Sequence, residues 1–268
     1  MIASSRQTLL ANLMQQACAV VLLVSLPNQL DKAAYAQVVF ASVLLSFMSW
    51  ADLGLSLVYG RLAPVLIAAG DDATVRRWST STLTFGLASS CVFSSLLALI
   101  YWLKYSQFEQ AALFAALPVG LYWASFHVSR LSVIGDFTEY RRVIGMRSVT
   151  SLLALPMVMT FGITGWFVSQ TVAVLLVLVY VGRRLLEPFG RIDLNLVREH
   201  VPEGLLLCAI TAAWLQLLNF GKLYASVRYP AEAVAHYGVV GAAYQSLSAL
   251  LISAFLPVTV GMLGRFAR

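Results

Sequence analysis

Long, uninterrupted hydrophobic runs dominate this chain and constrain its fold more than any other feature. Apolar residues make up 60% of its 268 residues, whereas charged residues make up only 11%. A water-soluble domain of that composition has too few polar residues to cover its surface, so the solvent of this chain is a lipid bilayer. In hydrocarbon, every backbone N–H and C=O group needs a partner within the protein, which leaves helices or a closed barrel. Because the runs do not alternate between polar and apolar residues, we predict an all-α, polytopic membrane helix bundle.

The runs divide the chain into eight predicted membrane-spanning helices. The longest segment without a charge, Ser148–Gly182, would measure about 52 Å as one helix, against a hydrocarbon core of about 30 Å. We therefore expect it to form the fifth and sixth spans, with a turn at Gly162–Gly165. The other predicted spans are Leu9–Leu26, Ala36–Tyr59, Leu83–Leu103, Ala111–Val128, Gly204–Ala225 and Tyr237–Met262.

The distribution of basic residues predicts that both ends of the chain lie in the cytoplasm. With the N-terminus inside, only four of the 18 Lys and Arg residues fall on the outer side, namely Lys32, Lys104, Lys222 and Arg228. The remaining basic residues gather in the inner segments, as the positive-inside rule requires for an even number of spans. The net charge of +6 is thus a topology signal. A nucleic-acid partner is not expected, since the arginines lie in short loops and form no basic domain.

Three parts follow from this division. Residues 1–182 form a six-helix N-terminal transmembrane lobe, residues 183–203 form a cytoplasmic interfacial connector, and residues 204–268 form the first two helices of an apparently incomplete second lobe. Within the connector, Asp193 is expected to cap a short helix that lies along the membrane surface. Its apolar face would carry Leu194, Val197 and Val201.

Polar side chains within the first two spans are candidates for function, because each costs free energy unless it faces a partner or water. Asn12, Gln15 and Gln16 share one helical face, which either lines an aqueous cavity or forms hydrogen bonds between helices. Asp52 lies near the inner end of the second span. It can pair with an arginine, bind a proton or cation as an ion-coupling group, or cap a local break at Gly54.

Further candidates lie in the fourth and seventh spans. Trp123, His127 and Arg130 form a stripe that is suited to a phosphate or sugar if it faces a cavity, although Arg130 also has the reach to extend to the lipid headgroups. Lys222 follows Gln216 and Asn219 at intervals of three residues. It is either an interfacial anchor or a cation exposed to a cavity.

Motifs for catalysis and for metal binding are absent from the sequence. The chain contains no H-E-x-x-H, G-x-S-x-G or Walker motif, and its cysteines and histidines do not have metal-ligand spacing. We therefore expect no enzymatic activity, no catalytic residues, no cofactor and no metal site.

Two stretches of the sequence resemble a known family. Tyr35-Ala36-Gln37 and Ala51-Asp52-Leu53-Gly54-Leu55, followed by Arg61-Leu62-Ala63, are similar to the N-terminal half of polysaccharide and O-antigen flippases. Leu218-Asn219-Phe220-Gly221-Lys222-Leu223-Tyr224 and Ala231–Gly238 resemble the seventh helix, the outer loop and the start of the eighth helix of the same family. These flippases belong to the multidrug/oligosaccharidyl-lipid/polysaccharide (MOP) exporter superfamily.

The resemblance implies a function in polysaccharide biosynthesis. Such a protein moves undecaprenyl-diphosphate-linked oligosaccharide across the bacterial inner membrane, so its partners are this lipid-linked oligosaccharide and membrane lipids. Family members have two pseudo-symmetric lobes. The chain therefore resembles one lobe plus two helices, and is either a truncated or split form or is completed by a second chain that supplies the missing helices.

The resemblance also implies a cationic cavity for the substrate diphosphate, with Arg61, Arg130 and Lys222 as its candidate cations. Two alternative functions remain open at this point. One is a drug exporter of the same superfamily that is coupled to an ion, for which Asp52 is the candidate coupling group. The other is a membrane-embedded glycan polymerase or ligase, although such enzymes need reactive side chains.

The predicted topology can be tested with reporter fusions. Reporters fused after Gly70, Gly190 and Arg268 should all lie in the cytoplasm, because the basic residues concentrate on that side. The measurement is the activity of a reporter that is active on only one side of the membrane. A periplasmic signal at Arg268 would contradict the even number of spans.

Overall fold

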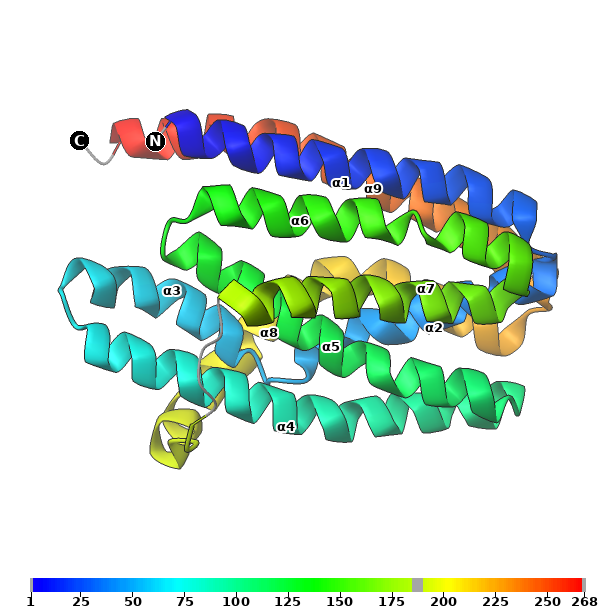
Figure 1. Cartoon of the computed structure of the whole chain (residues 1–268), viewed down its shortest axis with the longest axis horizontal. Helices are drawn as coiled ribbons and strands as arrows, with labels where there is room; N and C mark the ends of the chain where they lie inside the picture. Colours follow the sequence, from blue (N-terminus) through cyan, green and yellow to red (C-terminus); the bar gives the residue numbers. More distant parts are fainter. Residues whose placement is uncertain (1, 185–189, 267–268) are drawn as a thin grey trace.

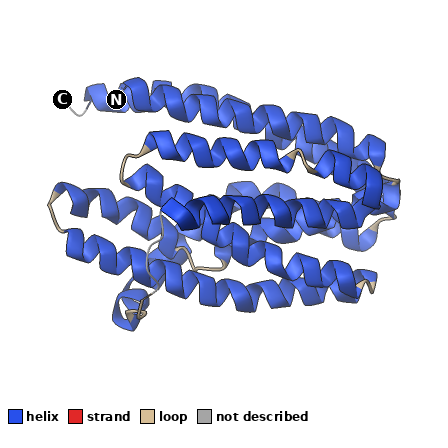
Figure 2. Ribbon diagram, viewed as in Figure 1, coloured by secondary structure: helices blue, strands red, loops and turns tan. Residues whose placement is uncertain are grey.

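The structure is a bundle of long helices (Figures 1 and 2). It is a computed structural model that describes residues 2–184 and 190–266, with side chains described for residues 9–182, 190–210 and 219–248. In chain order, its helices are α1 (Ile2–Gln29), α2 (Lys32–Ser46), the short 3-10 helix η1 (Phe47–Trp50), α3 (Leu55–Ala68), α4 (Asp72–Tyr105), α5 (Phe108–Val133), α6 (Phe137–Ser151), α7 (Ala154–Arg184), α8 (Leu194–Arg228) and α9 (Ala231–Phe266).

The length and composition of these helices make the chain a helical membrane protein. Within the described side chains, five segments are long and apolar enough to cross a membrane, namely Leu9–Gln29, Lys32–Trp50, Asp72–Tyr105, Phe108–Val133 and Ala154–Gly182. The predicted all-α membrane bundle is therefore confirmed. The number of eight spans stays a prediction.

The predicted second span, Ala36–Tyr59, is not one continuous helix. The chain passes from α2 through η1 into four turn residues, 51–54, before α3 begins. Leu53 and Gly54 have φ angles of 54° and 78°, in the left-handed region, which no α-helix can accommodate. The prediction of one span over Ala36–Tyr59 was therefore wrong, because the Asp-Leu-Gly sequence forms a turn at this point.

The expected turn within Ser148–Gly182 is confirmed. Gly162 has φ 58° and ψ −138°, a conformation that breaks α7 into two segments. Gly165 then lies so close to the preceding segment that a Cβ atom would come within 2.0 Å of the Met157 carbonyl oxygen. Glycine at both positions lets the chain reverse at one end of the bundle (Figure 1).

Within its described residues, 183–184 and 190–203, the predicted connector at 183–203 does not form a separate short helix. Asp193 does cap a helix, since its carboxylate accepts hydrogen bonds from the N–H groups of Asn195 and Leu196. That helix is α8, which continues through Pro202 to Arg228. Leu196 and Val197 are buried in the bundle while Leu194 is exposed, so the predicted apolar face of Leu194, Val197 and Val201 was also wrong. The packing of α8 against α3 and α4 determines that Leu196 and Val197 are the buried residues of this turn.

Small residues allow α4 and α5 to pack closely along their length. A Cβ atom on Gly86 would come within 1.8 Å of the Tyr122 hydroxyl oxygen, so the tyrosine ring lies directly over this glycine. Ser94 donates a hydrogen bond to the carbonyl oxygen of Ala115 across the same interface. The close packing of α4 against α5 places Tyr122 beside the break between α2 and α3.

The last two helices pack against the first part of the chain. α8 contacts α2 and α3, and α9 contacts α1 and α2. Figure 1 shows α1 and α9 side by side, with the start of α1 and the end of α9 at the same end of the bundle. The turns that join α3 to α4 and α5 to α6 lie at this end too, as the predicted orientation requires for the arginine-rich side.

The break between α2 and α3 depends on two glycines. A Cβ atom on Gly54 would come within 2.1 Å of the Gly204 carbonyl oxygen in α8, and the φ of Gly54 is positive. Gly54→Ala should therefore destabilise the protein by about 2 kcal/mol or more, from backbone strain and overpacking together. The measurement is thermal unfolding of the purified protein in detergent. Gly60→Ala is the matched control, because Gly60 lies in α3 with nothing within 4 Å of its Cβ position. Equal stability of the two variants would contradict the close contact.

Candidate functional site

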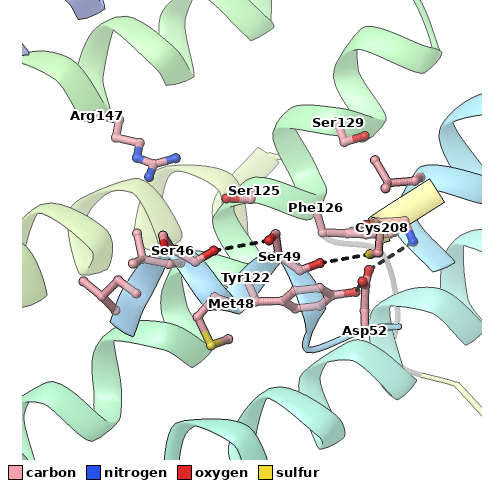
Figure 3. Close-up of a pocket in the computed structure, with 14 residues that line it drawn as sticks. Ser46, Met48, Ser49, Asp52, Tyr122, Ser125, Phe126, Ser129, Arg147 and Cys208 are labelled. Carbon is pink, nitrogen blue, oxygen red and sulfur yellow. Dashed lines mark hydrogen bonds between the residues drawn. The ribbon is translucent and has the colours of Figure 1, made fainter. Parts of the chain in front are cut away.

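A cavity of about 370 Å³ with a mixed polar and apolar lining lies where α2, α3, α5, α6 and α8 meet (Figure 3). We call it the inner cavity, because it lies beside the break at the inner end of the predicted second span. Its polar lining consists of Ser46, Ser49, Asp52, Ser56, Tyr122, Ser125, Ser129, Arg147 and Cys208. Hydroxyl groups, one carboxylate and one guanidinium group therefore surround a space large enough for a small molecule or part of a larger one.

Asp52 stabilises the break between α2 and α3 from within this cavity. Its side chain is only 2% exposed. One carboxylate oxygen accepts a hydrogen bond from the Gly54 N–H at 3.0 Å, and the other accepts one from the Ser56 N–H at 3.0 Å. The Tyr122 hydroxyl lies 3.4 Å from the second oxygen. Asp52 thus satisfies the N–H groups that the break leaves without helical partners.

Among the options for Asp52 that the sequence leaves open, the geometry selects capping of the break. No arginine forms an ion pair with this carboxylate in the described part of the chain. Arg61 pairs with Glu203 of α8 at 3.1 Å instead.

Arg147 supplies the positive charge of the inner cavity. Its guanidinium group points from α6 toward Ser46 and Ser125 (Figure 3). Neither a carboxylate nor any other described side chain forms an ion pair or hydrogen bond with it. A planar guanidinium group beside several hydroxyls suits a phosphate or a polyhydroxylated group.

A second cavity, of about 310 Å³, lies between α1, α2, α7, α8 and α9. We call it the outer cavity; its polar lining includes Lys222 and Gln245 together with Tyr35 and Ser42. The Lys222 ammonium group donates to Gln245 Oε1 at 2.9 Å, and Gln245 Nε2 donates to Asn219 Oδ1 at 3.2 Å. Lys222 is only 7% exposed, so it is part of a cavity wall and not an anchor at the interface.

The other candidate cations lie outside these two cavities. The Arg61 side chain is 63% exposed, on the surface between α3 and α8. Arg130 is half-buried near the inner end of α5. Trp123 Nε1 donates to His127 Nε2 at 2.8 Å, and His127 is buried. The structure therefore places Arg61, Arg130 and Lys222 at three separate positions.

The polar face of α1 does not line either cavity. Gln15 is exposed, and Asn12 and Gln16 are half-exposed. Within the described side chains, none of the three forms a hydrogen bond with another helix. The Gln216 side chain lies outside the described residues.

Sequence reasoning missed Tyr122 and Arg147 as parts of the site. Tyr122 lies in an ordinary apolar span, and only the tertiary structure places it over Gly86 and beside Asp52. Arg147 directly precedes the long uncharged run, and a charge at such a boundary was one available signal. Its position beside Ser46 and Ser125 depends on how α6 packs.

Comparisons with known proteins do not assign the chain to a family. No protein-family model, curated protein or solved structure matches it. The fold and its cavities define a helical membrane protein with charged side chains between its helices. In the described side chains, no group of three or more metal-ligating residues gathers as a metal site would require.

Replacing Asp52 tests its structural role. Asp52→Ala leaves the buried Gly54 N–H and the part-buried Ser56 N–H without their partners, so the free energy of unfolding should fall by about 2–4 kcal/mol. Asp52→Asn keeps one acceptor oxygen, so its free energy of unfolding should fall by less than that of Asp52→Ala. Thermal and chemical unfolding of the purified variants in detergent measures both. If Asp52 were instead a free ion ligand, removing a buried charge would leave stability unchanged or raise it.

Proposed function

We propose that this protein is a transporter for an amphiphile with an anionic headgroup, and specifically a flippase for undecaprenyl-diphosphate-linked oligosaccharide in the bacterial inner membrane. The resemblance to the MOP exporter superfamily motivates the substrate. The cavities between the helices supply the physical support, since a flippase needs polar space inside the membrane for a charged, hydrated headgroup while the lipid tail remains in the bilayer.

The observation that carries this proposal is the buried charge of Lys222. Its ammonium group contacts the neutral amide of Gln245, and within the described residues no carboxylate neutralises it. A buried cation with a neutral partner costs free energy. That cost is explained if an anion occupies the outer cavity during the transport cycle, as charged residues within membrane spans commonly mark a substrate path.

The two cavities provide polar groups at two depths along the bundle. Cys208 lines the inner cavity and Lys222 lines the outer cavity, and both lie on α8. Lys222 is 14 residues after Cys208, which corresponds to about 21 Å along the helix axis. A headgroup that moves along α8 would meet Arg147 first and Lys222 later, so a cation is present at both levels.

The alternative of an ion-coupled drug exporter depends on Asp52. Both of its carboxylate oxygens already accept backbone hydrogen bonds that hold the break between α2 and α3. This structural use makes Asp52 a poor candidate for a site that must exchange a proton or cation in each cycle. The geometry therefore favours the flippase over this alternative. We expect no catalytic role, since the described residues that line the two cavities include no pair of groups arranged as nucleophile and base.

The test of this proposal is glycan export in the host bacterium. Loss of the gene should abolish surface glycan while lipid-linked oligosaccharide accumulates in the membrane. In the deletion strain, the Lys222→Gln and Arg147→Gln variants should each export about tenfold less glycan than the wild-type protein. The reason is that each variant loses a charge-assisted contact with phosphate. Lys222→Arg keeps the charge and should retain more activity than Lys222→Gln.

Lys32→Gln is the matched control for Lys222→Gln. Lys32 is exposed and pairs with Glu232 at the surface, so its loss removes the same charge without touching a cavity. Export by this variant should equal that of the wild type at equal membrane levels. Normal surface glycan in the absence of the protein would refute the proposed function, and normal export by both cavity variants would refute the role of the two cations.

A further inference from the structure

A shallow pocket outside the two cavities collects three arginines. Arg76 and Arg77 come from the second turn of α4, and Arg191 comes from the segment just before α8. The pocket has a volume of about 540 Å³, and the side chains of Thr80 and Ser81 complete its wall. We call it the arginine pocket.

Backbone contacts hold Arg191 opposite the two arginines of α4. On one side of it, Gly190 lies so close to α4 that a Cβ atom would come within 2.3 Å of Thr80 Cγ2. On the other side, the Asp193 N–H donates to Ser81 Oγ at 3.2 Å. The segment is thus fixed to α4 at both of its ends, and the pocket is formed before any ligand binds.

The charges of the pocket favour an anion. Arg77 is paired with Asp193, whose pKa is held below its usual range by the Leu196 N–H and by Arg77, so this carboxylate stays ionised. Arg76 and Arg191 form no ion pair with a described carboxylate. Asp72 also lines the pocket, where the N-terminus of α4 stabilises its charge. Two guanidinium groups therefore remain to contact a ligand.

The pocket lies at the depth of the lipid headgroups. Trp102, near the opposite end of α4, is 25 residues from Arg77, or about 38 Å along the helix. A bilayer measures about 40–45 Å including its headgroups. If Trp102 lies at one interface, Arg77 lies among the headgroups of the other, on the arginine-rich side that the sequence predicts to be cytoplasmic.

We propose that the arginine pocket binds the phosphate of an anionic phospholipid headgroup, with Arg76 and Arg191 as its main contacts. Guanidinium groups form paired hydrogen bonds with phosphate oxygens, and the Thr80 hydroxyl is available as an additional donor. The lipid would add to the contacts that already hold the segment before α8 against α4. This site is separate from the inner and outer cavities, and it does not depend on the transport function proposed above.

The experiment is a titration of the purified full chain in neutral detergent, followed by thermal unfolding. The probes are short-chain phosphatidylglycerol, short-chain phosphatidylcholine and inorganic phosphate. Phosphatidylglycerol should raise the unfolding midpoint, and phosphatidylcholine should have little effect. The double variant Arg76→Gln/Arg191→Gln should need about tenfold or more phosphatidylglycerol for the same shift, since two charge-assisted hydrogen-bonding groups are lost.

The control is Arg141→Gln/Arg198→Gln, which removes the same charge from two exposed arginines that do not line the pocket. Its unfolding midpoint should rise with phosphatidylglycerol concentration as that of the wild type does. An equal loss in the control would show diffuse attraction to a basic surface and overturn the proposal. A shift with inorganic phosphate as large as that with phosphatidylglycerol would identify a soluble phosphate as the ligand and overturn the assignment to lipid, as would equal responses to the two lipids.

Discussion

The arrangement of the site depends on one carboxylate that holds a break in a membrane helix. Asp52 accepts hydrogen bonds from the Gly54 and Ser56 N–H groups, which no helical carbonyl can reach. In hydrocarbon such groups cannot remain without partners, so the break and the carboxylate are required together. Because Gly54 has no side chain, the backbone of α8 at Gly204 approaches closely, and Cys208 of the same helix lines the inner cavity. The cavity thus follows from the way the break is stabilised.

Charged side chains between the helices are the second organising feature. Arg147 faces hydroxyl groups in the inner cavity, and Lys222 contacts an amide in the outer cavity. Neither cation has a described carboxylate partner that would neutralise it, in contrast to Lys32 and Arg61 at the surface. A protein that used these side chains only for stability would do better with apolar residues. This cost is the physical basis for proposing an anionic ligand that enters the bundle.

The arginine-rich end of the bundle uses its charges differently. There, Arg77 and Asp193 join α4 to the cap of α8, and the neighbouring Arg76 and Arg191 face an open pocket. At the membrane surface, where the sequence predicts this end to lie, charges are close to water and to lipid phosphates and cost little free energy. A lipid bound at this point would stabilise the junction at which the chain enters α8. Because α8 lines both cavities, its attachment to α4 also bears on their shape.

The sequence by itself determined the membrane environment, the helical class and the turn at Gly162, because a bilayer permits few backbone arrangements and glycine permits the reversal. It also indicated the Asp193 cap, which depends only on neighbouring residues. The tertiary structure alone decided that Asp52 caps a break, that Lys222 faces a cavity, and that Arg61 lies at the surface. Hydrophobic runs contain no information about which face of a helix meets which neighbour. That choice is made by close contacts at glycines distant in sequence from their partners, such as Gly54 with Gly204 and Gly86 with the Tyr122 ring.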